Sequence, residues 1–170
     1  MMSETSKPTV TGLYHVGLHA KDPVQMAAFY RDVIGMQIVS NVDHPIARMI
    51  FLSSRPHEEA HELVFTSNPE LAHVAFKVET LADLRAFYQH IVEKGLPIEA
   101  AFNHGASLAF YFRDLESNLI EIYWPTDLAS KQPDSYPIDL TLPETTLLET
   151  IAEHAARTEA GQPDGRSPGQ

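Results

Sequence analysis

Residues 13–18 read Leu13-Tyr14-His15-Val16-Gly17-Leu18, and residues 71–76 read Leu71-Ala72-His73-Val74-Ala75-Phe76. The same tripeptide, Ala-Phe-Tyr, follows each histidine, at residues 28–30 and again at residues 86–88. The offset between the copies is 58 residues in both places (73 − 15 and 86 − 28). Because self-similarity at a fixed spacing marks a duplicated structural unit, the sequence predicts two similar modules.

A third stretch extends the repeat to a pair of glutamates. Residues 61–65 read His-Glu-Leu-Val-Phe and residues 120–124 read Ile-Glu-Ile-Tyr-Trp, which offsets Glu62 from Glu121 by 59 residues (121 − 62). A repeat that keeps two histidines and two glutamates indicates a site shared between the modules.

Composition excludes several classes of function. The chain has 170 residues, a net charge of −11 and no cysteine. The charge argues against binding to nucleic acid or to an anionic membrane surface, because phosphates require a basic patch. Without cysteine, disulfides and thiolate sites are excluded. The N-terminus has no apolar signal region, and no run approaches the roughly 18 apolar residues of a membrane span. We therefore expect a cytoplasmic protein that contacts no membrane.

Periodicity and capping residues predict a βαβββ order in each module. Asp22 and Pro23 begin a helix whose apolar residues, Phe29 among them, are spaced to pack into a core, and Gly35 ends it. Thr80 begins the second helix, which runs to about residue 94. The strands are expected at 12–20, 36–43, 47–53 and 61–66 in the first module, and at 71–78, 97–103, 107–113 and 119–125 in the second.

The C-terminal part of the chain departs from the repeat. Residues 126–142 show little periodicity and are expected to form an arm without a strand, followed by a helix from Leu142 to about Arg157 and a disordered tail. The prediction is thus an α+β domain over residues 1–128, with modules at about 12–66 and 71–125, and a C-terminal extension over residues 129–170.

Strand alternation places the repeated polar residues on one face. Side chains point alternately to the two faces of a strand. On this basis Tyr14 faces the helix, whereas His15, Glu62, His73 and Glu121 point inward and converge between the modules. Two imidazoles and one carboxylate with open positions are typical of non-haem Fe(II) oxygenases, and a second carboxylate suits Ni(II) or Zn(II). A lone strand histidine is commonly a core or surface residue, but two buried glutamates without a cation would be costly.

This pattern resembles the vicinal-oxygen-chelate superfamily, which includes glyoxalase I, bleomycin- and fosfomycin-resistance proteins and type I extradiol ring-cleaving dioxygenases. The resemblance covers residues 12–125 and implies that the two modules form a barrel-shaped cleft. It also implies that His15, His73 and Glu121 are the metal ligands, with Glu62 in a possible fourth position.

One motif resembles the signature of the extradiol dioxygenases. That signature contains a histidine, a tyrosine, the sequence Asp-Pro-any-Gly and the ligand glutamate. His104, Tyr111, Asp114 and Glu121 fall in register with it. Leu115 and Ser117 replace the proline and the glycine of the turn.

A second segment leaves two alternatives open. His61-Glu62 resembles the segment that carries a catalytic histidine in extradiol enzymes, but on a regular strand only one of these neighbours can face the metal. If Glu62 faces inward, a four-ligand glyoxalase-type site is favoured. If a bulge turns His61 inward, the dioxygenase is favoured.

The resemblance implies Fe(II)-dependent, extradiol cleavage of a catechol-type aromatic diol by O2. It assigns His61 to the O2 side of the metal, and His104 with Tyr111 to the substrate side. The alternatives are a glyoxalase-type lyase or isomerase using Ni or Zn, with Mn as a further possible metal, and a drug-binding resistance protein without catalysis. By analogy with the superfamily, we also expect a homo-oligomer, a dimer or larger.

Overall fold

The computed structural model describes residues 7–126 and 135–159, and the strands within those ranges form one sheet in the order β2-β3-β4-β1-β5-β8-β7-β6-β9. Antiparallel pairing of β1 with β5 joins the modules at the centre, while β1–β4 and β5–β8 pair in parallel. The predicted α+β fold of two tandem βαβββ modules is confirmed. The strands are β1 (Gly12–His19), β2 (Gln37–His44), β3 (Ala47–Ser53), β4 (Leu63–Thr66), β5 (His73–Lys77), β6 (Ile98–Asn103), β7 (Ser107–Arg113), β8 (Leu119–Pro125) and β9 (Tyr136–Pro137).

The helices begin and end at the residues that the sequence indicates. Helix α1 (Pro23–Phe29) starts where Asp22 Oδ1 accepts a hydrogen bond from Gln25 N at 3.0 Å. It continues as a π-helical turn, η1 (Tyr30–Ile34), and ends at Gly35 with φ of 86°. Helix α2 (Leu81–Glu93) starts with a capping box between Thr80 and Asp83. A 3-10 turn, η2 (Pro69–Leu71), links the modules.

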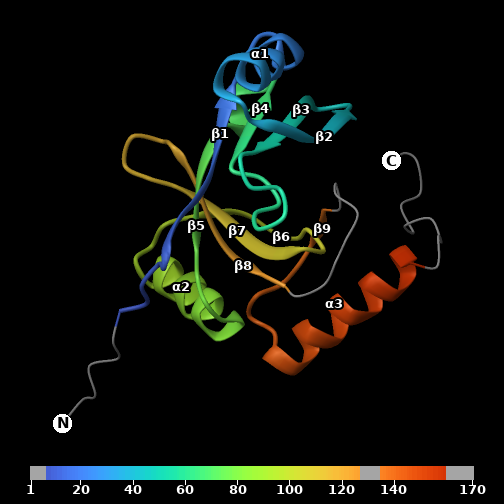
Figure 1. Ribbon diagram of the computed structural model, residues 1–170. Helices are drawn as coiled ribbons and strands as arrows, with labels where there is room; N and C mark the ends of the chain where they lie inside the picture. Colours follow the sequence, from blue (N-terminus) through green and yellow to red (C-terminus); the bar gives the residue numbers. More distant parts are fainter. Residues whose placement is uncertain (1–6, 127–134, 160–170) are drawn as a thin grey trace.

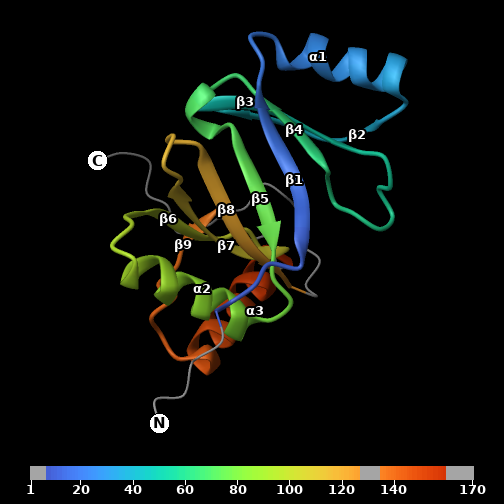
Figure 2. The ribbon, with the colours of Figure 1, turned by 90° about the vertical axis from the view of Figure 1, so that its left-hand side faces the viewer.

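Each half of the sheet is covered by helices on one face only (Figure 1). Helix α1 packs over β3 and β4 through a cluster that includes Ala27, Leu52 and Phe65. Helices α2 and α3 (Glu144–Glu159) share a second cluster with β7 and β8, in which Leu84 and Phe110 are fully buried. The sheet curls between its two halves, which meet along β1 and β5 (Figure 2). The opposite face is therefore left for the polar residues of the repeat.

The C-terminal segment differs from the sequence prediction in one respect. No strand was expected between residues 126 and 142, but Tyr136–Pro137 forms β9 on the outer edge of β6. The physical reason is that an edge strand offers unpaired backbone groups, which a neighbouring segment can satisfy. Helix α3 agrees with the predicted helix, whereas the predicted disordered tail lies beyond the described residues.

Two aromatic residues expected in the core between the first helix and the sheet lie elsewhere. The pairing of β1 with β5 shifts between Leu13 and His15, and this β-bulge turns Tyr14 to the same face as His15. There the Tyr14 ring lies 4.6 Å from that of Tyr123. Phe29 is 51% exposed, because Ala27 of α1 and Tyr30 of the following turn face the sheet in its place. Within the described ranges, no helix is both long and apolar enough to cross a membrane.

Candidate metal centre

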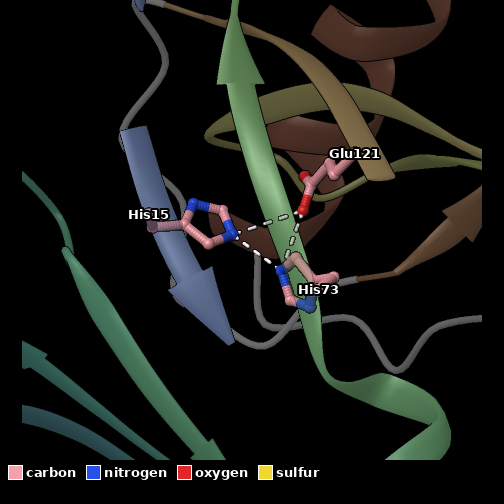
Figure 3. A group of neighbouring side chains, drawn as sticks. All are labelled: His15, His73 and Glu121. Carbon is pink, nitrogen blue, oxygen red and sulfur yellow. Dashed lines mark hydrogen bonds and ion pairs between the residues drawn. The ribbon is translucent and has the colours of Figure 1, made fainter. Parts of the chain in front are cut away.

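Three side chains from the middle of the sheet converge on one point (Figure 3). His15 comes from β1, His73 from the adjacent strand β5, and Glu121 from β8 on the far side of β5. His15 Nε2 lies 2.8 Å from His73 Nε2, and Glu121 Oε2 lies 3.3 Å from the first nitrogen and 3.1 Å from the second. The predicted convergence of these three residues therefore agrees with the geometry.

Burial and charge make the cluster a site for a cation. His15 and Glu121 are buried, at 6% and 3% exposure. Burial by itself raises the pKa of Glu121, but the charges and hydrogen bonds of His15 and His73 lower that pKa well below its ordinary value. Burial by itself lowers the pKa of His73, yet the Glu121 carboxylate raises that pKa overall. A buried carboxylate that faces two imidazole nitrogens is stabilised by positive charge, which a protonated imidazole or a cation bound between the three side chains can supply.

The donor set fits one divalent metal ion. At metal–ligand bonds of about 2.1 Å, adjacent octahedral ligands lie about 3.0 Å apart and tetrahedral ligands about 3.4 Å apart. The three observed distances between donor atoms, 2.8, 3.1 and 3.3 Å, lie on either side of the octahedral value. The three atoms therefore match one triangular face of an octahedron. His73 Nδ1 donates to the backbone oxygen of Leu71 at 2.7 Å, which leaves Nε2 as the metal donor. Two histidines and one carboxylate on one face are typical of non-haem iron oxygenases.

His61 lies beside this cluster on the side of the first module. Its ring centroid is 4.4 Å from that of His15 and 5.0 Å from that of Phe51. Burial, assisted by the positive charge of His15, lowers the pKa of His61 to about 3. The side chain is therefore a neutral imidazole near pH 7. Of the two alternatives that the sequence left open for this segment, the geometry has His61 facing the cluster.

Glu62, by contrast, does not join the cluster, which corrects the expected convergence of four residues. Its carboxylate accepts hydrogen bonds from Ser54 N at 2.6 Å and Ser54 Oγ at 2.5 Å, and it forms an ion pair with Arg55 at 3.0 Å. These contacts, from Ser54 most of all, lower its pKa to about 2.

Strand register explains why the glutamates are not equivalent. Glu121 pairs with Ala75, two residues after His73, and the residue paired with Gly17, two residues after His15, is Val64. The structural counterpart of Glu121 is therefore Val64, whereas Glu62 precedes the first residue of β4. The sequence repeat matched the glutamates two residues out of register.

His104 and Tyr111 form a pair on the side of the second module. His104 Nε2 lies 3.0 Å from the Tyr111 hydroxyl, and Tyr111 is the direct cross-strand neighbour of Glu121. Burial and then the Glu121 charge raise the pKa of Tyr111 well above its ordinary value, so the hydroxyl keeps its proton. His61 and the His104–Tyr111 pair thus flank the three-residue cluster from opposite modules.

Sequence reasoning missed the position of Tyr14 in this site. The ring of Tyr14 lies 5.7 Å from that of His15 and packs against Tyr123. Burial and a hydrogen bond with Glu59 raise the pKa of Tyr14 to about 12. Strand alternation places Tyr123 on the same face as Glu121, but the bulge that turns Tyr14 leaves no clear signal in the sequence.

Comparisons with known proteins agree with this geometry. A model of the glyoxalase/bleomycin resistance protein/dioxygenase superfamily matches residues 12–122. Biphenyl-2,3-diol 1,2-dioxygenase 3 from Rhodococcus globerulus is 30% identical over 122 residues, which are 65% of this chain and 61% of that relative. The chain therefore spans less than two thirds of the relative's length.

Solved structures of similar fold include both dioxygenases and a glyoxalase. A variant of homoprotocatechuate 2,3-dioxygenase from B. fuscum superposes with a TM-score of 0.59 and 25% identity, over 73% of this chain and 35% of that one. The Mn(II)-bound glyoxalase from Novosphingobium aromaticivorans gives a TM-score of 0.56 and 20% identity, over 71% and 42%. At 20% identity, the likeness to the glyoxalase shows a shared fold alone.

Proposed function

Because the chain belongs to the glyoxalase/bleomycin resistance/dioxygenase superfamily, we propose that it is an Fe(II)-dependent dioxygenase that opens a catechol-type aromatic diol by extradiol cleavage. One observation carries the proposal. A face of three metal donors is flanked by His61 from one module and by the His104–Tyr111 pair from the other. Such a site has groups for proton transfer on both sides of the ion.

His15, His73 and Glu121 would hold the metal. Fe(II) bound on this face would bring a catecholate and O2 into contact at its open positions. Two neutral imidazoles and one carboxylate offset only part of a divalent charge, so a bound diol anion would be favoured. Mn(II), whose ligand preferences overlap those of Fe(II), is the alternative metal for the same chemistry.

The flanking residues have the protonation states that the proposed roles require. Tyr111 keeps its proton and can donate a hydrogen bond to a substrate oxygen, while His104 accepts from or donates to that hydroxyl at 3.0 Å. His61 is neutral and can accept a proton on the O2 side. The rings of Phe51 and Phe102 lie beside His61 and His104 and supply apolar surface for an aromatic substrate.

The position of Glu62 weighs against a lyase or isomerase with four protein ligands. Its carboxylate is committed to Ser54 and Arg55, so three metal-ligating groups meet in the part of the chain that the structure describes. A drug-binding protein without metal would not need a buried carboxylate between two histidines. Both alternatives are less well supported than the dioxygenase.

Metal analysis after anaerobic purification tests the proposal. We expect Fe(II), or Mn(II), bound in a one-to-one ratio, together with a ring-opened product when the loaded protein meets a panel of catechols in air. Bound nickel or zinc with turnover of a hemithioacetal would favour the lyase instead. A protein that binds no metal and turns over neither substrate would favour the drug-binding alternative.

A further inference from the structure

We propose that Gly17 is a positioning residue for His73: the absence of a side chain at residue 17 is what allows the His73 ring to reach the metal centre. The inference rests on the proposed function only in that the cluster binds a metal. Gly17 and His73 are direct partners in the antiparallel pairing of β1 with β5. Their side-chain positions therefore lie next to each other on the same face of the sheet.

The space between these two residues is too small for a methyl group. A Cβ atom on Gly17 would lie 2.7 Å from His73 Nδ1, 2.8 Å from His73 Cε1 and 3.2 Å from the His73 backbone nitrogen. Carbon atoms in van der Waals contact are about 3.5–4.0 Å apart. Gly17 has none of the left-handed backbone geometry found at Gly35 and Gly95. Space, and not backbone conformation, is the reason for a glycine here.

The His73 ring cannot move aside without losing its role. Its Nδ1 is held at 2.7 Å by the backbone oxygen of Leu71. Its Nε2 lies within 3.1 Å of both His15 and Glu121. The Tyr111 ring packs against it at 6.2 Å with an interplanar angle of 83°. Any rotation that makes room for a methyl group breaks at least one of these contacts.

The residue paired with the histidine differs between the two modules, and the hydrogen bonds of the two histidine rings differ as well. His15 pairs with Ala75, whereas His73 pairs with Gly17. The ring next to the glycine has its second nitrogen fixed by Leu71. The ring next to the alanine has a buried Nδ1 without a hydrogen-bond partner among the described residues. The glycine therefore lies opposite the histidine whose tautomer and orientation are set by a backbone group.

The test compares Gly17→Ala with Gly12→Ala, a matched change in the same strand. A Cβ atom on Gly12 would meet no atom within 4 Å. Isothermal titration calorimetry with Fe(II), or with Co(II) as a stable substitute, is run anaerobically on folded protein. We expect Gly17→Ala to weaken metal binding by about 10–100-fold, the scale of losses when a ligand's support is removed. We expect Gly12→Ala to bind as the unaltered protein does. Equal affinity in all three proteins would overturn the inference.

A second measurement separates this inference from the proposed function. Thermal unfolding without metal is compared for Gly17→Ala alone, His73→Ala alone and the double variant. Gly17→Ala should lower Tm much more in the natural background than when His73 is alanine, because the contacts with the ring are then gone and only the 3.2 Å contact with the backbone nitrogen remains. An equal loss of Tm in both backgrounds, or a double variant that does not fold, would contradict the role of Gly17. Failure of the unaltered protein to bind metal, with the coupling in Tm intact, would contradict the proposed function alone.

Discussion

Glu121 supplies the negative charge of the candidate metal centre from a position with almost no contact with water. Its carboxylate faces two imidazole nitrogens at 3.1 and 3.3 Å, and their charge keeps it ionised. Among single residues, the proposed metal site therefore depends most on this group. His15 and His73 complete a face that the carboxylate alone could not form.

We predict that Glu121→Ala loses Fe(II) and activity together, because the variant has no anionic ligand. Glu121→Gln keeps the volume and removes the charge, and it should also bind metal weakly. The control is Glu116→Ala, an exposed glutamate in the preceding turn, which should bind metal normally. Iron content per protein measures the effect, and full iron in Glu121→Ala would contradict the assignment.

The flanking pair should affect turnover without affecting the metal. We predict that His104→Ala slows ring cleavage by roughly 10²–10⁴-fold, the usual scale for lost acid–base assistance. Tyr111→Phe should cost about 1–3 kcal/mol in the activation barrier, the scale of one hydrogen bond in a buried site. Steady-state rates must be compared at equal iron content. If both iron-loaded variants cleave the ring at the rate of the unaltered protein, the pair has no catalytic role.

The turn between β7 and β8 is an element in which the sequence departs from the extradiol signature. Ser117 stands where that signature has glycine, and its φ is 65°, a left-handed conformation that costs energy for any residue with a side chain. We predict that Ser117→Gly raises the free energy of unfolding by about 0.5–1 kcal/mol. Ser107→Gly, within strand β7, should lower it. Urea unfolding measures both, and a loss of stability in Ser117→Gly would contradict the prediction.

The segment before β4 should contribute to stability through Glu62 and not to metal binding. Glu62→Gln should keep normal iron content and lose about 1 kcal/mol of stability at pH 7, a modest value because the side chain is 24% exposed. Its pKa falls from 4.5 to about 2 on folding, so the stabilisation is complete above about 4.5 and disappears as the pH falls towards 2. Urea unfolding between pH 7 and pH 3 should show the two proteins converging in acid. Loss of iron in Glu62→Gln would favour the four-ligand lyase.

Residues close together in the sequence predicted where the helices begin and end. Pairing between distant strands decided where Tyr14 and Glu62 lie, and the sequence could not show that pairing. Asp22, Thr80 and Gly35 cap or end helices through contacts with near neighbours, so their roles are visible in the sequence. The positions of Tyr14 and Glu62 depend on a bulge between β1 and β5 and on the register of β1 with β4. Neither feature has a marker in the residues themselves, because register is set between strands distant in sequence.

At the scale of the whole molecule, the uncovered side of α1 and η1 carries apolar side chains. Phe29, Val33 and Ile34 are 51%, 64% and 59% exposed, and all belong to this one segment. Contiguous exposed apolar surface is characteristic of protein–protein contacts. By analogy with the superfamily we expect a homo-oligomer, and we expect its copies to meet at this surface.

We predict that the natural chain is a dimer in solution and that Val33→Asp is monomeric with an unchanged fold. Leu115→Asp is the matched control, since Leu115 is 96% exposed in the β7–β8 turn, away from α1. Light scattering coupled to size-exclusion chromatography gives the mass of each. A Val33→Asp protein with the mass of the natural one would contradict this interface.

We propose that this molecule consumes O2 to open a catechol ring at a centre made by His15, His73 and Glu121. The most direct measurement is oxygen uptake by the Fe(II)-loaded protein across a panel of catechols, with the product followed in the same samples. We predict that each molecule of O2 consumed yields one molecule of product whose ring is opened beside the two hydroxyls. Glu121→Ala should show no uptake. Fully iron-loaded protein that consumes no O2 with any catechol would contradict the proposed function.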